Sequence, residues 1–255
     1  MKLGFLPYLN VKPLIYTLEH GGLPKGWECL YAPPSKLAQM LVSGKIAAAP
    51  VSSFATFLYP ELKICPDICI AADGPVISVL MLSKKPFNEV ETVALDTSSL
   101  SGANMLRIIL DEAYNLHPEL VHLPPDPVSE MLERCDAALV IGNPAMLYPK
   151  DGLYVMDLAQ EWGKLTGLPA VFAVWAGREM TPELIKVLQD AKAESTKMIP
   201  EIVREESPRL GLSAELCEEY LTRIITYNLG EREIQGLETF EKKAIEHGLV
   251  GTASK

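Results

Sequence analysis

Short apolar runs alternate with helical segments at the start of the chain, and no other feature of the sequence constrains the fold as strongly. Runs at residues 2–6, 27–32 and 46–49 have the length of buried strands, and residues 13–20 and 34–42 have helical spacing. Strand–helix–strand units with right-handed crossovers build a parallel sheet that helices cover on both faces. The sequence therefore predicts an α/β fold.

Polar side chains follow two of these expected strands. Asn10 comes after the first strand, and Ser52 and Ser53 come after the third. Ligands of parallel α/β sheets bind beyond the carboxyl ends of the strands. We therefore expect the three side chains to belong to a binding site, although an Asn in such a place can also act only as a turn former.

A break in the strand–helix pattern at residues 84–88 indicates where a second lobe begins. An apolar run at residues 170–176 has the character of a buried strand and can carry the chain back. The predicted organisation is a first lobe of residues 1–86 and 172–255, which includes the C-terminal helices, and a second lobe of residues 87–171.

The other elements follow from hydrophobic periodicity. Further strands are expected at residues 68–72, 76–83, 92–95, 120–123, 137–141 and 154–158. Helices are expected from residue 103, at 128–134 and 159–165, and in three C-terminal segments at 182–207, 213–226 and 231–247.

Four hydroxyl side chains gather where the strand at residues 92–95 gives way to a helix: Thr97, Ser98, Ser99 and Ser101. Backbone N–H groups, hydroxyls and the positive end of the helix dipole bind anions at such a junction. One such residue would be a simple N-cap, but four within five positions favour a ligand site. The stretch lacks the Gly-rich pattern and Lys of a phosphate loop, so we expect a small carboxylate.

Composition excludes several classes of function. Of 255 residues, 48% are hydrophobic and 22% are charged, as in ordinary globular domains. The net charge of −10 disfavours a nucleic-acid surface, which needs a basic stripe. No apolar stretch reaches membrane-spanning length, and the N-terminal one is too short for a signal peptide. We therefore expect a cytoplasmic protein with a small-molecule substrate and no nucleic-acid or membrane partner.

Groups that titrate near neutral pH are scarce at the expected strand ends. His122 is the one His near them, and it is more simply a solvated side chain. The five cysteines are scattered, and no His/Cys/Asp/Glu group has metal-ligand spacing, so no metal is expected. Ser78 and Asn143 add to the uncharged polar residues, which suit binding and orienting an anion rather than acid–base chemistry.

Several motifs together resemble the chorismate dehydratases of the futalosine route to menaquinone. In chain order they are FLPYLNVKPL at residues 5–14, GPVISVLMLS at 74–83, VALDTSSLS at 93–101, ALVIGNPA at 138–145, DLAQEW at 157–162 and TGLPAVFAVW at 166–175. The resemblance implies a two-lobed, periplasmic-binding-protein-like (type II) fold with a helical C-terminal segment. It also implies removal of water from chorismate to give 3-[(1-carboxyvinyl)oxy]benzoate, without metal or organic cofactor.

The resemblance assigns roles to the polar residues. It implies that Asn10 orients the group that removes the proton, for which the substrate's own side-chain carboxylate is the candidate. Together with the pattern of polar residues at the strand ends, it makes Asn10 and Ser78 the candidate catalytic residues. The candidate substrate-binding residues are Ser52, Ser53, Thr97, Ser98, Ser99, Ser101 and Asn143.

Two positions depart from the family's pattern. An acidic residue is common near Ala47 and Ala48, and another is usual where this chain has Asn143. Two other functions therefore stay open. One is the sibling enzyme 1,4-dihydroxy-6-naphthoate synthase, whose His base could here only be His122. The other is a binding protein for a small carboxylate.

Overall fold

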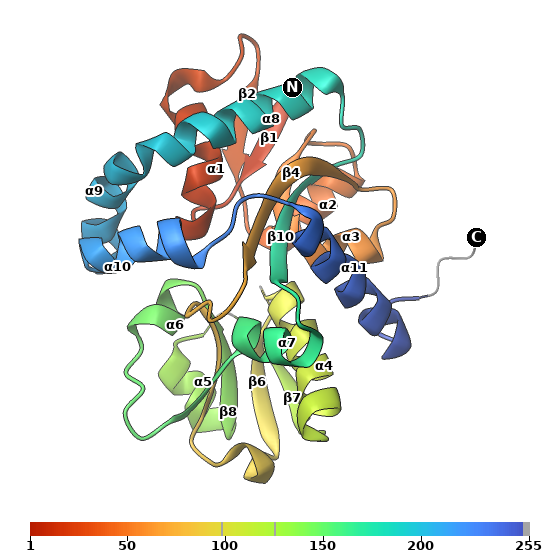
Figure 1. The fold of residues 1–255 in the computed structure, drawn as a ribbon, viewed down its shortest axis with the longest axis vertical. Coiled ribbons are helices and arrows are strands. Elements are labelled where there is room, and N and C mark those ends of the chain that lie inside the picture. Colours follow the sequence, from red (N-terminus) through yellow and green to blue (C-terminus); the bar gives the residue numbers. More distant parts are fainter. Residues whose placement is uncertain (98, 125, 252–255) are drawn as a thin grey trace. The chain divides into compact units, whose positions relative to one another are not determined.

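The structure is a computed structural model that describes residues 1–97, 99–124 and 126–251. The chain divides into two compact units, and Figure 1 labels their elements. Unit 1 contains Met1–Ala71 and Val171–Glu233, and unit 2 contains Ala72–Ala170 and Ile234–Lys255. Each unit has strands and helices of its own.

Unit 1 contains two small sheets. Strand β1 (Lys2–Phe5) pairs in parallel with β2 (Glu28–Tyr31), as a strand–helix–strand unit requires. Strand β10 (Ala170–Gly177) lies between β3 (Ala49–Ser52) and β4 (Lys63–Ala72), and it is antiparallel to β3. The predicted parallel arrangement holds for β1 with β2 and for the bridge between Leu3 and Ala48, and β10 adds an antiparallel strand beside β3, so the pairing in this unit is mixed.

The third strand also begins later than predicted. Residues 47 and 48 do lie beside β1, where Ala48 O accepts a hydrogen bond from Gly4 N at 2.9 Å and Ala47 N donates to Lys2 O at 2.8 Å. Regular pairing with β10 starts only at Ala49 and continues to Ser52. The predicted span of 46–49 thus marks the approach to the strand rather than the strand itself.

A single long helix is predicted over residues 182–207, but the structure divides it. Helix α8 (Pro182–Ser195) is followed by the 3-10 turn η4 (Thr196–Met198) and α9 (Ile199–Leu210). Pro200 lies in the first turn of α9, where its missing N–H cannot continue the preceding helix. The other helices of unit 1 are η1 (Leu9–Val11), α1 (Lys12–Thr17), η2 (Leu18–Gly22), α2 (Pro34–Val42), α3 (Ser53–Leu58), α10 (Ala214–Glu219) and η5 (Tyr220–Ile224).

Five strands form one sheet in unit 2, within residues 72–97, 99–124 and 126–170, in the order β7-β6-β8-β5-β9. Strand β6 (Thr92–Asp96) is parallel to β7 (Glu119–Leu123) and β8 (Ala137–Ile141). Strand β5 (Val79–Ser83) is antiparallel to β8 and to β9 (Tyr154–Asp157). The carboxyl ends of β6 and β8 and the amino end of β5 therefore lie at the same edge of the sheet.

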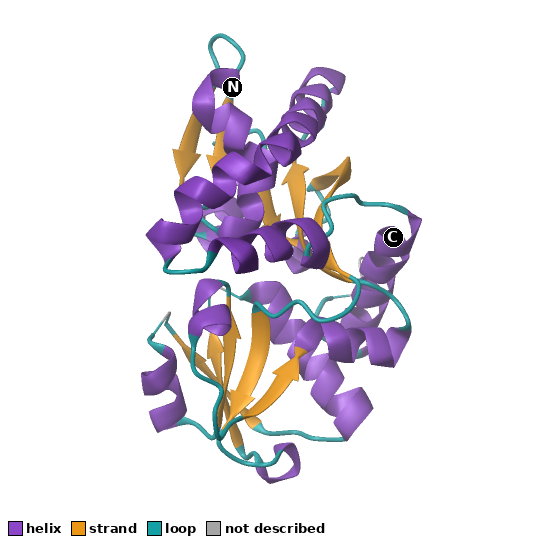
Figure 2. Ribbon diagram, turned by 60° about the vertical axis from the view of Figure 1, so that its left-hand side comes forward, coloured by secondary structure: helices purple, strands orange, loops and turns teal. Residues whose placement is uncertain are grey.

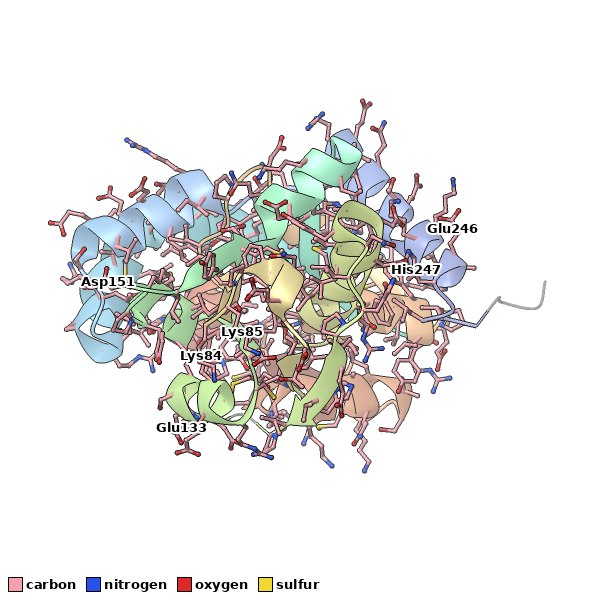
Figure 3. All side chains as sticks on the ribbon, turned by 90° about the horizontal axis from the view of Figure 1, so that it is seen from below. Lys84, Lys85, Glu133, Asp151, Glu246 and His247 are labelled. Carbon is pink, nitrogen blue, oxygen red and sulfur yellow. The ribbon has the colours of Figure 1, made fainter. Side chains whose placement is uncertain are left out.

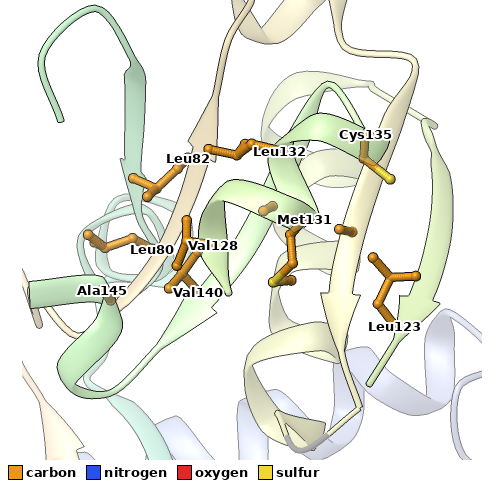
Figure 4. Close-up of a cluster of buried hydrophobic side chains, with 11 residues drawn as sticks. Leu80, Leu82, Leu123, Val128, Met131, Leu132, Cys135, Val140 and Ala145 are labelled. Atoms are coloured by element: carbon orange, nitrogen blue, oxygen red, sulfur yellow. The ribbon is translucent and has the colours of Figure 1, made fainter. Parts of the chain in front are cut away.

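Helices cover both faces of this sheet (Figure 2). Helix α5 (Val128–Arg134) packs Met131 and Leu132 against side chains of β5 and β8 (Figure 4). Helix α4 (Leu100–Tyr114) lies on the other face, since Gly102 faces Val79 and Leu139. Alternate strand residues point to opposite faces, so β5 gives Leu80 to α5 and Val79 to α4.

The remaining helices of unit 2 are η3 (Phe87–Glu89), α6 (Asn143–Leu147), α7 (Leu158–Thr166) and most of α11 (Glu231–Glu246). None of the described helices is both long enough and apolar enough to cross a bilayer.

The turn after β5 lies at the carboxyl end of that strand. Lys84 and Lys85 lie there (Figure 3), and the Lys85 ammonium pairs with Asp136 Oδ1 at 2.8 Å. Asp136 Oδ2 accepts the backbone N–H groups of Glu91 and Thr92 at 3.0 and 3.3 Å. The hydrogen bond from Lys85 holds the pKa of the Asp136 carboxyl below its ordinary value.

The division of the chain differs from the predicted lobes in two places. The chain enters unit 2 at Ala72 rather than after residue 86, because β5 pairs only with strands of that unit. The described residues from Ile234 on belong to unit 2 rather than to the first lobe. Phe240 of α11 packs edge-on against Trp162 of α7, with ring centroids 5.4 Å apart.

Candidate functional site

The predicted hydroxyl cluster lies at the N-terminus of α4, at the edge of the unit 2 sheet where β6 ends. Ser99 is the N-cap residue and Ser101 belongs to the first turn; both are buried, while Thr97 is exposed. The Ser99 hydroxyl makes no capping hydrogen bond to the helix, and the first turn contains no acidic residue. The N–H groups of such a turn have no helix carbonyl to bind, so they favour an anion. Ser98 lies outside the described residues.

A glycine makes room for the Ser99 hydroxyl. A Cβ atom on Gly102 would lie 2.5 Å from Ser99 Oγ, 3.3 Å from Val79 Cγ1 and 3.6 Å from Leu139 Cδ2. The first distance is closer than atoms in van der Waals contact can come. Gly102 therefore permits both the close packing of α4 on the sheet and the position of the Ser99 hydroxyl.

Ser78 and Asn143 lie at the same edge of the sheet. Ser78 is buried and immediately precedes β5, and its carbonyl accepts a hydrogen bond from Gly142 N at 2.7 Å. Asn143 is partly exposed and begins α6 directly after Gly142. Unit 2 thus brings the Ser99 and Ser101 end of α4, Ser78 and Asn143 to one edge, as the sequence predicts.

The strand predicted at residues 76–83 begins only at Val79. Ile77 has a φ of 58°, a left-handed conformation that a β-branched residue rarely adopts. This conformation interrupts the extended chain just before Ser78. The N–H of Ile77 donates to Asp157 Oδ2 at 2.7 Å, and the N–H of Val76 donates to Asp157 Oδ1 at 3.0 Å.

Unit 1 holds the other predicted residues. Asn10 lies in η1, beyond the carboxyl end of β1, and its Oδ1 is buried without a hydrogen-bond partner among the described residues. Ser52 ends β3, which continues a segment that runs parallel to β1, so both residues lie at the same strand ends. The buried Ser53 donates its hydroxyl proton to Val171 O at 2.6 Å, so this proton is not available to a ligand.

Titratable and metal-binding groups are scarce around these positions. His122 is exposed at β7, and its Nε2 lies 3.1 Å from an Arg107 guanidinium nitrogen. Among residues 1–97, 99–124 and 126–251, no group of three or more His, Cys, Asp or Glu side chains is arranged to hold a metal ion. The arrangement offers hydrogen-bond donors to an anion and few protonatable groups.

Residues 1–246 match the protein family described as menaquinone biosynthesis. The chain belongs to this family. A family relative from Thermus thermophilus, named chorismate dehydratase, is 31% identical over 259 residues, which cover 93% of this chain and 93% of the relative. A second relative, the chorismate dehydratase of Campylobacter jejuni, is 28% identical over 249 residues, covering 95% of this chain and 96% of the relative. The predicted family is thus confirmed.

Solved structures of low sequence identity share the fold. A protein from Archaeoglobus fulgidus superposes with a TM-score of 0.78 at 18% identity over 98% of both chains. The periplasmic aliphatic sulphonate binding protein of Escherichia coli superposes with a TM-score of 0.67 at 16% identity, over 99% of this chain and 88% of that one. These structures confirm the predicted periplasmic-binding-protein-like α/β fold of this family member.

Asp157 is a residue near the site that the sequence does not single out. Its carboxylate lies next to the loop that carries Ser78, but in the sequence it resembles an ordinary helix N-cap. The only signal is its place in the DLAQEW motif. Contacts between residues about eighty positions apart cannot be read from local periodicity.

Proposed function

We propose that this protein removes water from chorismate to give 3-[(1-carboxyvinyl)oxy]benzoate. The observation that carries the proposal is the 31% identity to a chorismate dehydratase over 93% of both chains. The edge of the unit 2 sheet supports it, because helix N–H groups and serine hydroxyls there suit a carboxylate. The uncharged character of Ser99, Ser101 and Asn143 also suits a substrate that is a dianion.

The proposed chemistry is the loss of a proton and a hydroxide from neighbouring ring carbons, completed by aromatisation. The proton on the ring carbon that bears the enolpyruvyl ether passes to a base. The electron pair moves into the ring diene and its carboxylate, then expels the neighbouring hydroxyl as hydroxide, which takes up a proton and leaves as water. Charge grows on the ring carboxylate in this sequence, so donors aimed at that group stabilise the transition state.

We propose a separate role for each candidate residue. Thr97, Ser98, Ser99, Ser101 and Asn143 hold the ring carboxylate, with Ser78 beside them as a catalytic donor. Asn10 orients the side-chain carboxylate that acts as base through its amide NH₂, because an amide oxygen accepts hydrogen bonds and cannot bind a carboxylate. Ser52 is a further binding residue, and Ser53 has the weakest support because its proton is bound to Val171 O.

We also propose that the reaction needs no metal or organic cofactor. Aromatisation supplies a large driving force, so the enzyme's main task is to position the substrate. Turnover should be the same after dialysis against EDTA as before. Loss of turnover that a divalent ion restores would refute this part of the proposal.

The proposal places the protein in the cytoplasm with a small-molecule substrate and no nucleic-acid or membrane partner. Its five cysteines are all free thiols, four of them buried, which suits a reducing compartment. The net charge of −10 also disfavours nucleic acid.

The deciding experiment is incubation of the purified protein with chorismate, followed by chromatography and mass spectrometry of the products. We expect the substituted benzoate to form faster than the uncatalysed rearrangement products of chorismate appear in buffer. Binding of chorismate without turnover would favour a carboxylate-binding protein instead. If the protein neither binds nor converts chorismate, the proposal is refuted.

A further inference from the structure

The carboxylate of Asp157, near the edge of the unit 2 sheet, accepts four backbone hydrogen bonds. Only 8% of the residue is exposed. Oδ1 accepts N–H groups from Val76 at 3.0 Å and from Ala159 and Gln160 at 3.1 Å each. Oδ2 accepts the N–H of Ile77 at 2.7 Å. Two of these donors begin α7, and the other two belong to the loop before Ser78.

An N-cap role explains only part of this arrangement. A side-chain oxygen that caps α7 needs only to accept N–H groups of the first turn, and Oδ1 does this. Oδ2 contributes nothing to the cap and is directed to Ile77 N, across 80 positions of sequence. The second oxygen therefore serves the loop.

The loop needs such a partner because its backbone is strained. Ile77 has a φ of 58°, which costs a non-glycine residue on the order of 1 kcal/mol or more. A charged acceptor stabilises an N–H more than a neutral one does, and the bond from Ile77 N is the shortest of the four. The hydrogen bond to Oδ2 therefore offsets the cost of the left-handed conformation.

The strained residue fixes two candidate site residues. Ser78 follows Ile77 directly, and its carbonyl accepts the N–H of Gly142 at 2.7 Å. Gly142 also has a positive φ, 67°, and the next residue is Asn143. Two hydrogen bonds thus connect Asp157 to Asn143 through chain neighbours. The first joins Asp157 to Ile77, which precedes Ser78, and the second joins Ser78 to Gly142, which precedes Asn143.

We propose that Asp157 is a positioning residue that holds Ile77 in its left-handed conformation and thereby sets the places of Ser78 and Asn143. This inference rests on the proposed function, since it assumes that Ser78 and Asn143 serve the dehydration. Asp157 itself is assigned no contact with the substrate, because its buried carboxylate accepts four of the protein's own N–H groups.

The first test is Asp157→Asn. The amide oxygen can still accept from Val76 and cap α7, since Asn is as good an N-cap as Asp, but the amide NH₂ then faces the N–H of Ile77. We expect kcat to fall on the order of tenfold or more with a smaller change in KM, as for loss of a charge-assisted hydrogen bond that supports the transition state.

Asp136→Asn is the matched control. Asp136 also accepts two backbone N–H groups in unit 2, from Glu91 and Thr92, but it precedes β8 at the opposite end of the strand from Ile141. We expect this variant to lose stability while kcat stays within about twofold of the parent. An equal fall of kcat in both variants would show that Asp157 acts only through stability and would overturn the inference.

The second test is rescue by Ile77→Gly in the Asp157→Asn background. Glycine adopts positive φ without a steric cost, so the loop no longer needs the carboxylate. We expect the double variant to recover most of the lost kcat. A further fall in kcat would overturn the inference, because it would mean that the Asp157 bond does not act through the strain at Ile77.

Backbone amide exchange separates this inference from the proposed function. Faster exchange at Ile77 and Gly142 in Asp157→Asn, with unchanged exchange at Ala159 and Gln160, supports the positioning role even if the parent protein does not convert chorismate. Unchanged exchange at Ile77 overturns the positioning role even if the parent protein is an active dehydratase.

Discussion

Replacing Gly102 by alanine tests whether the Ser99 hydroxyl serves the substrate. The added Cβ would lie 2.5 Å from Ser99 Oγ, about 1 Å closer than van der Waals contact, and 3.3 Å from Val79 Cγ1. The serine can relieve the first contact by rotating about χ1, and small shifts relieve the second. The substitution should therefore move one hydroxyl and leave the fold intact.

The expected effects on stability and activity have different sizes. Alanine is favoured over glycine within a helix by about 1 kcal/mol, which offsets the crowding at Ser99 and Val79, so the free energy of unfolding should change by less than about 1 kcal/mol. A hydrogen bond from a hydroxyl to a carboxylate contributes about 1.5–3 kcal/mol. If Ser99 donates to the ring carboxylate in the transition state, kcat/KM should fall roughly ten- to a hundredfold.

Steady-state turnover of chorismate and urea unfolding measure the two quantities. Gly163→Ala in α7 is the control, because a Cβ added there would meet nothing within 4 Å and the variant should gain about 1 kcal/mol with unchanged turnover. Ser99→Ala should lower kcat/KM by itself, and adding Gly102→Ala to it should cause no further loss. Full activity of Gly102→Ala alone, or a further loss in the double variant, would refute the reasoning.

Three further predictions concern single side chains. Asn10→Ala should lower kcat on the order of tenfold or more in steady-state assays while KM changes little, and a rise in KM at full kcat would make Asn10 a simple binding residue. Burial acts to raise the pKa of Glu112, but hydrogen bonds from Lys243 and His247 outweigh it and lower the pKa below its ordinary value. Stability that Glu112 provides should therefore be present at about pH 6 and be lost as the pH falls through the lowered pKa. In urea unfolding, Glu112→Gln should be destabilising at about pH 6, and the difference from the parent should shrink as the pH falls through that pKa. Burial and the hydrogen bond to Glu161 raise the pKa of Tyr114 to about 12, so Tyr114→Phe should be destabilising below pH 10 by about 1 kcal/mol, with the difference shrinking as the pH rises toward 12.

Hydrophobic periodicity predicts the elements that are defined by their own stretch of sequence. The bounds of β8 (Ala137–Ile141) and α5 (Val128–Arg134) agree with the prediction because each is a short apolar or amphipathic run between clear breaks. The position of Ser99 and Ser101 at a helix N-terminus was also predictable, since it requires only a strand end followed by a helix start. These features depend on neighbours along the chain.

The missed features depend on contacts that local sequence does not encode. The insertion of β10 beside β3 joins residues about 120 positions apart, so the first three strands gave no sign that the sheet would be mixed. The left-handed Ile77 contradicts its own β-branched preference, and the acceptor of its N–H, Asp157, lies 80 positions later in the chain. The roles of Asn10, Ser52, Ser53, Ser78, Asn143 and the α4 hydroxyls stay predictions.

A buried carboxylate beside a site for a dianion raises an electrostatic question, because like charges repel strongly where water is excluded. Asp157 meets this problem by accepting four backbone N–H groups, two of them at the positive end of α7. These dipoles stabilise its charge within the protein. Asn143 adds no negative charge to the same edge. An acidic group can therefore hold the Ser78 loop without repelling the anion that the loop is proposed to bind.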